Sequence, residues 1–323
     1  MPMLLRINSG NRKILWMLLR IGIAAVSLWF IYGKIADRTG PESLRSVLRF
    51  LIHFPDNYLE LLMVLLLMPL NWSLESFKWK KLLQPVCAIS FAKAIRSVLS
   101  GTTIGLFTPN RIGEFAGRVM HLEPQYRIQG TIANIIGSLS QLLITILLGS
   151  IALFISISTS ESAFAGSGML MRLASLALPI VALLIYFKIP VIVRLLKRDD
   201  WNKYTDMLLN YRSGFMLRIA LLSLIRYAVF AVQFLITLHL FGIEIPAVQG
   251  LRIIAIIYLI MAVVPTIALS EITVRGSVAL YLLTPFTGDA VAVLSASTFI
   301  WILNLALPAS FGAFSALWIR FTK

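Results

Sequence analysis

Long hydrophobic segments alternate with short polar ones along the chain. A helix needs about 20 residues to cross the hydrocarbon core of a membrane. Apolar runs that approach or exceed this length occur near residues 14–33, 59–77, 129–157, 169–187, 217–241 and 290–319. The strict alternation of membrane barrels is missing. The pattern therefore predicts an all-α polytopic membrane protein whose full spans are these runs.

Two further apolar regions, residues 90–122 and 247–283, are each long enough for two short helices. Each is interrupted near its middle, by Pro109 or by Pro265, and proline disfavours a continuous helix. We expect these prolines, together with Gly113, to break the helices and to make each region a re-entrant helical hairpin. The alternative is eight full spans, with both regions crossing the membrane.

The positions of Lys and Arg set the orientation, because cytoplasmic loops carry an excess of both. The N-terminal end of the first apolar run carries Arg6, Arg12, Lys13 and Arg20, and Lys78, Lys80 and Lys81 mark the cytoplasmic end of the second. We therefore place both termini in the cytoplasm and the protein in the cytoplasmic (inner) membrane. Three of the loops expected outside, residues 158–168, 242–247 and 284–289, contain no Lys or Arg. Residues 34–58 are also expected outside, although they contain Lys34, Arg38, Arg45 and Arg49.

These orientations predict one integral membrane domain, residues 1–323, with an internal repeat. Residues 59–157 and 217–319 each read as span, hairpin, span, but in opposite directions, which makes the second an inverted copy of the first. Inverted repeats with broken helices are typical of transporters, since the interrupted backbone lines a polar cavity near the midplane. Residues 1–58 are expected to be an N-terminal span followed by an external amphipathic segment.

Two charged motifs occupy the interrupted regions. The first, "FTPNRIGEFAGR" (107–118), contains Arg111, Glu114 and Arg118, and the second, "VPTIALSEITVR" (264–275), contains Glu271 and Arg275. In both, a glutamate precedes an arginine by four residues, the spacing of an ion pair on one helix face. Charged side chains are costly inside a membrane and usually pair or face a water-filled cavity.

These motifs have two interpretations. The glutamate and arginine of each motif neutralise each other, or the motifs meet and bind substrate. Substrate binding also explains why an extra arginine, Arg111, lies at a chain break, because the guanidinium fork binds phosphate oxygens at two points. If the tips form one site, Glu114 should couple to Arg275 and Glu271 to Arg118.

Other polar residues lie within the apolar runs. Glu75 and Asn71 lie in the second run, and Arg226 lies about two turns into the run 217–241, where it either extends toward the cytoplasm or reaches the cavity. We count all three as candidate substrate-binding residues. Interhelical hydrogen bonds are the simpler interpretation of the remaining amides. The tryptophans are expected mostly near the membrane interfaces.

The composition and net charge of the chain limit the partners and cofactors that we expect. The chain has 323 residues, of which 59% are hydrophobic and 13% charged, and a net charge of +15. The basic excess lies beside apolar runs, where it meets anionic membrane lipids, so no nucleic-acid partner is expected. The three histidines are scattered and the cysteine is single. The sequence therefore predicts no metal site and no cofactor.

The two motifs, and "NWSLESFKWKKLL" before the first, resemble the flippase-like membrane family typified by the transmembrane half of lysylphosphatidylglycerol synthases. The first motif follows the family's Pro-x-Arg-x-Gly-Glu pattern, whereas "TIALS" replaces the glycines often seen in the second. The resemblance implies movement of an anionic or aminoacylated phospholipid, or of a polyprenyl-phosphate-linked sugar, across a bilayer. No aminoacyl-transferase domain is present, so we expect a separate lipid-modifying enzyme to supply that chemistry.

We therefore predict a translocator of an anionic lipid, not an enzyme, with no catalytic residues. Arg111, Arg118 and Arg275 would hold phosphate, and the two motif glutamates would orient them. The alternatives are a membrane enzyme that acts on a lipid-linked phosphate and a regulatory membrane subunit that transports nothing. The enzyme would need a nucleophile or a metal site, and the sequence has neither pattern.

Overall fold

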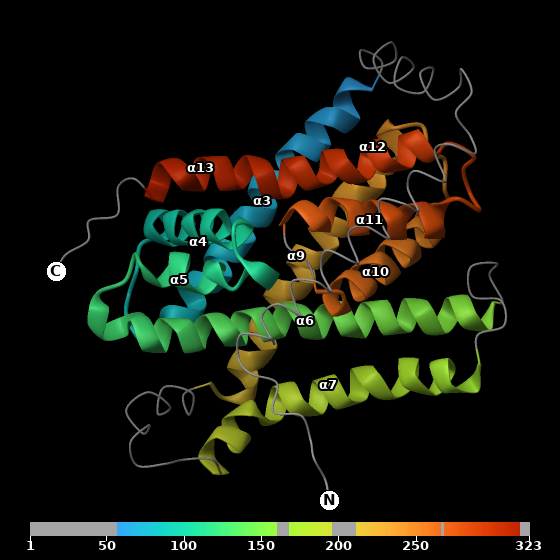
Figure 1. Cartoon of the computed structure of the whole chain (residues 1–323). Coiled ribbons are helices and arrows are strands. Elements are labelled where there is room, and N and C mark those ends of the chain that lie inside the picture. The colour runs from blue at the N-terminus through green and yellow to red at the C-terminus, as the bar shows by residue number, and fades with distance from the viewer. Residues whose placement is uncertain (1–56, 160–167, 196–210, 266–267, 317–323) are drawn as a thin grey trace, which may run out of the picture.

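The structure is a computed structural model that describes residues 57–159, 168–195, 211–265 and 268–316 (Figure 1). Every regular element in these residues is a helix, as predicted. The predicted first span and the amphipathic segment, residues 1–58, lie almost wholly outside the described part. The long helices are α3 (Tyr58–Leu83), α6 (Arg127–Ser158), α7 (Met169–Leu195) and α9 (Ser213–Leu240). Shorter helices are α4 (Phe91–Leu106), α5 (Gly113–Val119), α10 (Ala247–Val263), α11 (Ala268–Leu283), α12 (Ala290–Trp301) and α13 (Leu307–Ala316).

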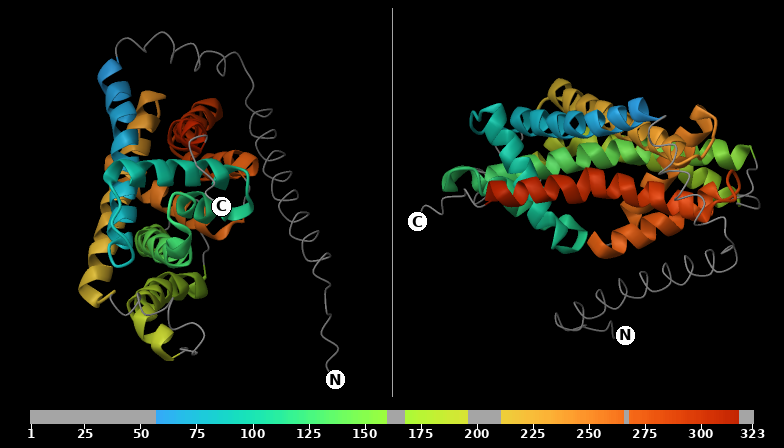
Figure 2. Two further views of the ribbon diagram at one scale, coloured as in Figure 1. Left: turned by 90° about the vertical axis from the view of Figure 1, so that its left-hand side faces the viewer. Right: turned by 90° about the horizontal axis from the view of Figure 1, so that it is seen from above.

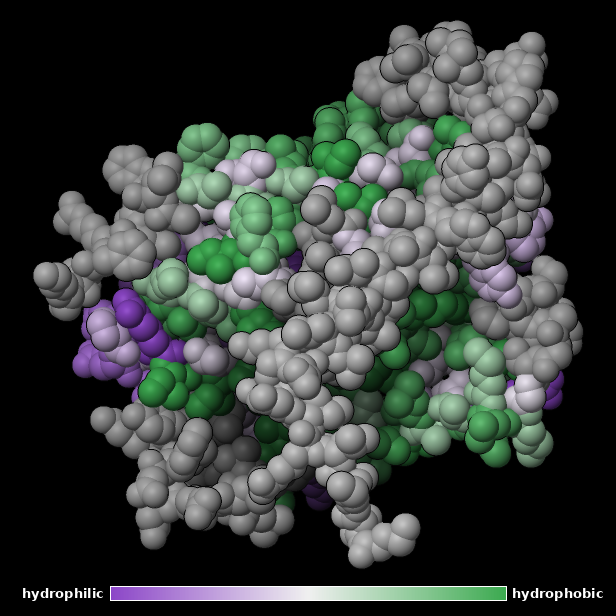
Figure 3. All heavy atoms as spheres, in the orientation of Figure 1, coloured by the Kyte–Doolittle hydropathy of each residue, from purple (hydrophilic) through white to green (hydrophobic). Residues whose placement is uncertain are grey.

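Five helices are long and apolar enough to cross a membrane. They span Tyr58–Leu83, Pro124–Ser158, Met169–Val191, Ser213–Leu240 and Ala290–Phe314. These correspond to the last five of the six predicted spans. Apolar side chains cover much of the flank of the bundle, and hydrophilic residues gather toward its two ends (Figure 3). The polytopic all-helical prediction is therefore confirmed for the described residues.

Both interrupted regions contain a helix pair. Between α4 and α5 the chain turns through a short 3₁₀ segment, Pro109–Arg111. Between α10 and α11 it passes Val264, whose backbone is extended, and Pro265. The pair α4/α5 lies at one end of the bundle, and α10/α11 approaches the middle from the other (Figure 2, right). The element order span, helix pair, span occurs twice, whereas the inverted symmetry of the two halves stays a prediction.

Small residues let α4 and α5 pack closely. A Cβ atom added to Gly117 would lie 2.6 Å from the Gly101 Cα atom and 2.8 Å from the Ser100 carbonyl oxygen. Both neighbours are backbone atoms, which cannot move aside as a side-chain end can. Gly113 likewise lies against Ile104, whose carbonyl oxygen would be 2.7 Å from an added Cβ atom. Gly113 thus begins α5 and allows close packing, while the chain reversal itself occurs at the residues before it.

The first prediction concerns membrane topology. If 90–122 re-enters on the cytoplasmic side, Cys87 and a cysteine at Gln125 in a Cys87→Ser background should react with reagents from the same face. A cysteine at Glu244 or Gly288 should react from the opposite face. Accessibility to a membrane-impermeant maleimide in oriented vesicles measures this. Opposite faces for Cys87 and Gln125 would show that the region crosses the membrane.

The second prediction concerns the α4–α5 contact. Gly117→Ala should lower the thermal stability of the detergent-purified protein, because overpacking a close contact costs about 1–3 kcal/mol. Gly214→Ala is the matched control, since an added Cβ atom meets nothing within 4 Å there. We expect a clear fall in the melting temperature for Gly117→Ala only. Equal melting temperatures for the two variants would contradict the close approach.

Candidate functional site

A cavity of about 480 Å³ lies where the two interrupted regions meet. Its walls come from both halves of the chain and include five of the predicted site residues. These five are Asn71, Arg111, Arg226, Glu271 and Arg275. Pro265, a predicted helix break, also lines the cavity. The other polar or aromatic lining residues are Trp72, Asn110, Gln141, Thr145, Tyr227, Phe230, Tyr258, Trp301 and Asn304. The sequence analysis therefore found the region of the cavity, but only part of its wall.

The cavity lies near the middle of the long helices. Asn71, Gln141 and Arg226 lie close to the midpoints of α3, α6 and α9 respectively, and Asn304 lies close to the midpoint of the helix Ala290–Phe314. The helix geometry at Asn304 is π, in the segment Ile302–Ala306 between α12 and α13. Single π turns within α-helices frequently occur at functional sites. If these helices span a membrane, the cavity lies near the midplane.

Arg111 reaches the cavity from an unusual backbone conformation. Both Asn110 and Arg111 have positive φ angles, 49° and 57°. Such left-handed conformations are uncommon for residues with a side chain and cluster at functional sites. Thr108 stabilises the turn, since its Oγ1 accepts a hydrogen bond of 2.7 Å from the Gly113 amide. The turn places the Arg111 guanidinium 3.7 Å from the carboxylate of Glu114.

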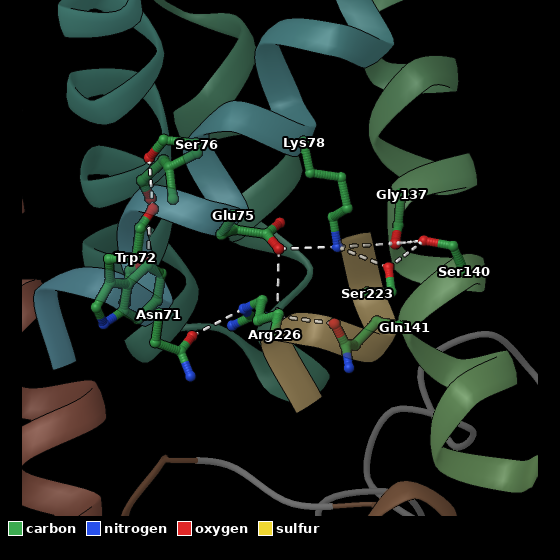
Figure 4. Close-up of polar contacts among 12 residues, drawn as sticks. Asn71, Trp72, Glu75, Ser76, Lys78, Gly137, Ser140, Gln141, Ser223 and Arg226 are labelled. Atoms are coloured by element: carbon green, nitrogen blue, oxygen red, sulfur yellow. Dashed lines mark hydrogen bonds and ion pairs between the residues drawn. The ribbon is translucent and has the colours of Figure 1, made fainter. Parts of the chain in front are cut away.

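A buried carboxylate lies behind the cavity wall (Figure 4). Glu75, on α3, is 4% exposed. Its oxygens lie 2.8 Å from Lys78 Nζ, 2.8 Å from an Arg118 guanidinium nitrogen and 3.2 Å from one of Arg226. These cations come from α3, α5 and α9, so one carboxylate connects three helices. A buried charge needs such partners, because desolvation penalises any charge left alone.

Arg118 lies too deep to line the cavity. It is 4% exposed, and its guanidinium pairs with both Glu75 and Glu114. It also lies over the Trp79 ring, 5.9 Å from the centroid. Of the three arginines predicted to hold phosphate, this one is therefore placed behind the wall, where it links α5 to α3.

Arg226 lies in the cavity wall, one of the two positions that the sequence allowed for it. Its Nε donates to Asn71 Oδ1 at 2.9 Å, and another guanidinium nitrogen donates to Gln141 Oε1 at 3.2 Å (Figure 4). The guanidinium also lies 5.7 Å from the centroid of the Trp72 ring. These contacts hold the side chain from α3 and α6, so its orientation is fixed by residues on other helices.

The second motif supplies Glu271 and Arg275, both on α11. Their side chains form an ion pair at 2.5 Å, as the spacing of four residues predicts. The first motif contains the corresponding pair, Glu114 with Arg118. Within the described residues the motif glutamates thus pair inside their own motifs. The two motifs nevertheless share one cavity, because Arg111 lines it together with Glu271 and Arg275.

Several side chains differ from the sequence interpretation. Lys78 was expected at the cytoplasmic end, but it is 1% exposed, and its Nζ lies 3.4 Å from both the Gly137 carbonyl oxygen and Ser223 Oγ (Figure 4). Trp72 and Trp301 line the cavity, whereas tryptophans were expected mostly near the interfaces. Lys78 turns inward because Glu75 lies one turn away on the same face of α3. The spacing of three residues between Glu75 and Lys78 was the one sequence signal for this inward position.

A comparison with models of protein families relates the chain to a known family. The model of the family described as the lysylphosphatidylglycerol synthase TM region matches residues 17–312. The matched range contains both charged motifs and every residue that lines the cavity. A search of curated proteins finds no significant match.

The third prediction tests the buried carboxylate. Glu75→Gln keeps the shape of the side chain but leaves its three cations without their shared anion. Breaking a buried ion pair on one side typically costs about 3–5 kcal/mol. We expect a large fall in the melting temperature of the purified protein, measured by tryptophan fluorescence in detergent.

Glu60→Gln is the matched control for this change. Glu60 pairs with His239, whose side chain is 60% exposed, at 2.9 Å. Exposed ion pairs contribute about 0–1 kcal/mol, so this variant should melt near the wild type. A Glu75→Gln protein as stable as Glu60→Gln would refute the central role of the Glu75 carboxylate.

Proposed function

The chain belongs to the lysylphosphatidylglycerol synthase TM region family, and on that premise we propose that it moves an anionic lipid across a bilayer. The observation that carries the proposal is the cavity between the two interrupted regions, with three arginines in its wall. A polar cavity near the middle of apolar helices suits a headgroup that must pass through the hydrocarbon layer. The lipid tails would stay in the membrane alongside.

Arg111 and Arg275 would bind the phosphate, because they belong to the two motifs and both line the cavity. Guanidinium groups bind phosphate oxygens in pairs, which fixes the headgroup as well as attracting it. Arg226, on α9, adds a third positive charge to the same cavity. The sequence predicted that Arg118 holds phosphate. We propose instead that it holds Glu114 and the first motif against α3.

Glu271 would take the place of the phosphate when the cavity is empty. Its carboxylate pairs with Arg275 and so compensates a charge that would otherwise be unpaired. An entering phosphate would compete for the same guanidinium. A ligand shifts a conformational equilibrium only if it binds one state more tightly than the other. A phosphate that replaces Glu271 on Arg275 would bind only the state in which this ion pair is open, and would therefore favour that state of the second motif.

We propose that the protein lies in the cytoplasmic membrane with its basic ends inside. A lipid-linked-phosphate enzyme is the rival. Release of phosphate or sugar by the purified protein in detergent, with no bilayer present, would favour that rival. Movement of intact fluorescent lipid between the leaflets of proteoliposomes would favour transport.

The fourth prediction uses this transport assay. Arg111→Lys and Arg275→Lys keep the charge but lose the planar two-point contact. Hydrogen bonds to charged groups contribute about 1.5–3 kcal/mol, so we expect transport of labelled phosphatidylglycerol to fall roughly tenfold or more in each variant. Dithionite quenching of the outer leaflet measures the rate.

Arg218→Lys supplies the comparison. Arg218 lies on α9, is exposed and does not line this cavity. The same chemical change there should leave the rate within about twofold, since surface substitutions usually change energies by less than about 0.5 kcal/mol. Wild-type rates in both cavity variants would contradict phosphate binding by Arg111 and Arg275.

A further inference from the structure

The charge of the cavity wall restricts the headgroup that it can accept. Its described lining residues include three arginines (Arg111, Arg226 and Arg275) and one glutamate (Glu271), a formal balance of +2. Among the described residues, the ion-paired groups behind the wall are Glu75, Glu114, Lys78 and Arg118, whose formal charges cancel. The whole cluster is therefore net positive, and it lies among apolar helices where screening by water is weak.

Each carboxylate of this cluster is already engaged. Glu271 pairs with Arg275, Glu114 pairs with Arg118 and lies near Arg111, and Glu75 has three cationic neighbours. An ammonium group entering the cavity would have to displace an arginine from its carboxylate. A lysylated phosphatidylglycerol carries two amines and one phosphate, so it is a net cation that this wall repels.

Neutral polar groups complete the wall. The hydroxyls of Tyr227 and Tyr258 and the indole N–H groups of Trp72 and Trp301 are buried and have no hydrogen-bond partner in the described part of the chain. The Asn304 Oδ1 atom is also buried and has no hydrogen-bond partner among the described residues. All five residues line the cavity. Buried polar groups are normally hydrogen-bonded, so a cluster of unpaired ones at one cavity calls for a ligand that can both donate and accept.

We propose that the lipid carried by this protein has a net-anionic, hydroxyl-rich headgroup, a phosphodiester followed by a polyol or sugar, and that an aminoacylated headgroup is a poor substrate. The phosphate matches the arginines, and the hydroxyls match the tyrosines, the indoles and Asn304. This inference rests on the proposed lipid transport and narrows its substrate class. The substrate proposed for this chain therefore differs from the lysylphosphatidylglycerol in the description of its family.

Three lipids with the same acyl chains test the inference on the full chain purified in detergent. Phosphatidylglycerol carries a phosphodiester and two hydroxyls, phosphatidylpropanol carries the same charge and no hydroxyl, and lysylphosphatidylglycerol carries the added amines. Native mass spectrometry of competing pairs reports relative affinity. We expect phosphatidylglycerol to bind about tenfold or more tightly than either competitor, because phosphatidylpropanol lacks the hydroxyls and lysylphosphatidylglycerol brings a net positive charge to a net positive wall.

The outcomes separate the inference from the proposal beneath it. Preference for lysylphosphatidylglycerol, or equal binding of phosphatidylglycerol and phosphatidylpropanol, overturns the inference and leaves lipid transport standing. Failure to bind any of the three lipids and to move any of them faster than protein-free liposomes overturns the proposed function itself. A polyprenyl-phosphate-linked sugar that outcompetes phosphatidylglycerol supports the inference and identifies the tail as polyprenyl.

Variants locate the preference in the cavity. Tyr258→Phe should reduce the preference for phosphatidylglycerol over phosphatidylpropanol several-fold. Trp301→Phe is a second, independent cavity variant and should have the same effect. Tyr211→Phe is the matched control, because that hydroxyl donates to the Leu82 carbonyl oxygen at 2.7 Å, outside the cavity. An unchanged preference in both cavity variants would overturn the inference.

The charge component has its own variant. Asn71→Asp is nearly isosteric, and its Oδ1 position already accepts from Arg226. It lowers the formal positive charge of the wall by one. We expect the discrimination against lysylphosphatidylglycerol to fall about tenfold or more, since nearby opposite charges in a poorly screened site attract strongly. Unchanged discrimination would show that wall charge does not select the headgroup.

Discussion

The buried carboxylate of Glu75 is the interaction on which the arrangement of the site depends. It lies on α3 and meets cations from α3 itself, from α5 and from α9. None of these charges could be left alone among apolar helices without a large desolvation cost. The first interrupted region, α5, is thus fastened to the second half of the chain, α9, through a single side chain on α3.

The arginines of the site fall into two groups, according to where their partners lie in the chain. Arg118 and Arg226 are held by groups on neighbouring helices, so their positions follow from the packing of the bundle. Arg111 and Arg275 have carboxylate partners only three or four residues away in their own motifs. Local pairs can move with the segment that carries them. The cavity therefore combines a fixed wall, to which Arg118 also fastens the first motif, with a second motif whose own ion pair would survive a shift of its tip.

The helical fold could be predicted because each long helix carries an apolar run of sufficient length, and the interruptions because Pro109 and Pro265 lie within such runs. The ion pairs of the motifs followed from a spacing of four residues, which is a local property. The inward turn of Lys78 could not be predicted in the same way, since "FKWKK" looks like any basic end of a membrane helix. The roles of Trp72, Tyr258 and Trp301 depend on which helices cross, and no local pattern encodes that crossing.

The same constraint connects assembly to selectivity. An excess of positive charge near the middle of apolar helices is unfavourable unless an anion compensates it. In the structure Glu271 compensates Arg275, whereas Arg226 shares the Glu75 carboxylate with Lys78 and Arg118, and Arg111 shares the Glu114 carboxylate with Arg118. A phosphate in the cavity would supply the missing charge, so the feature that makes the empty site costly is also what favours an anionic headgroup. Selection against a cationic headgroup then needs no separate barrier, because the wall that attracts one charge repels the other.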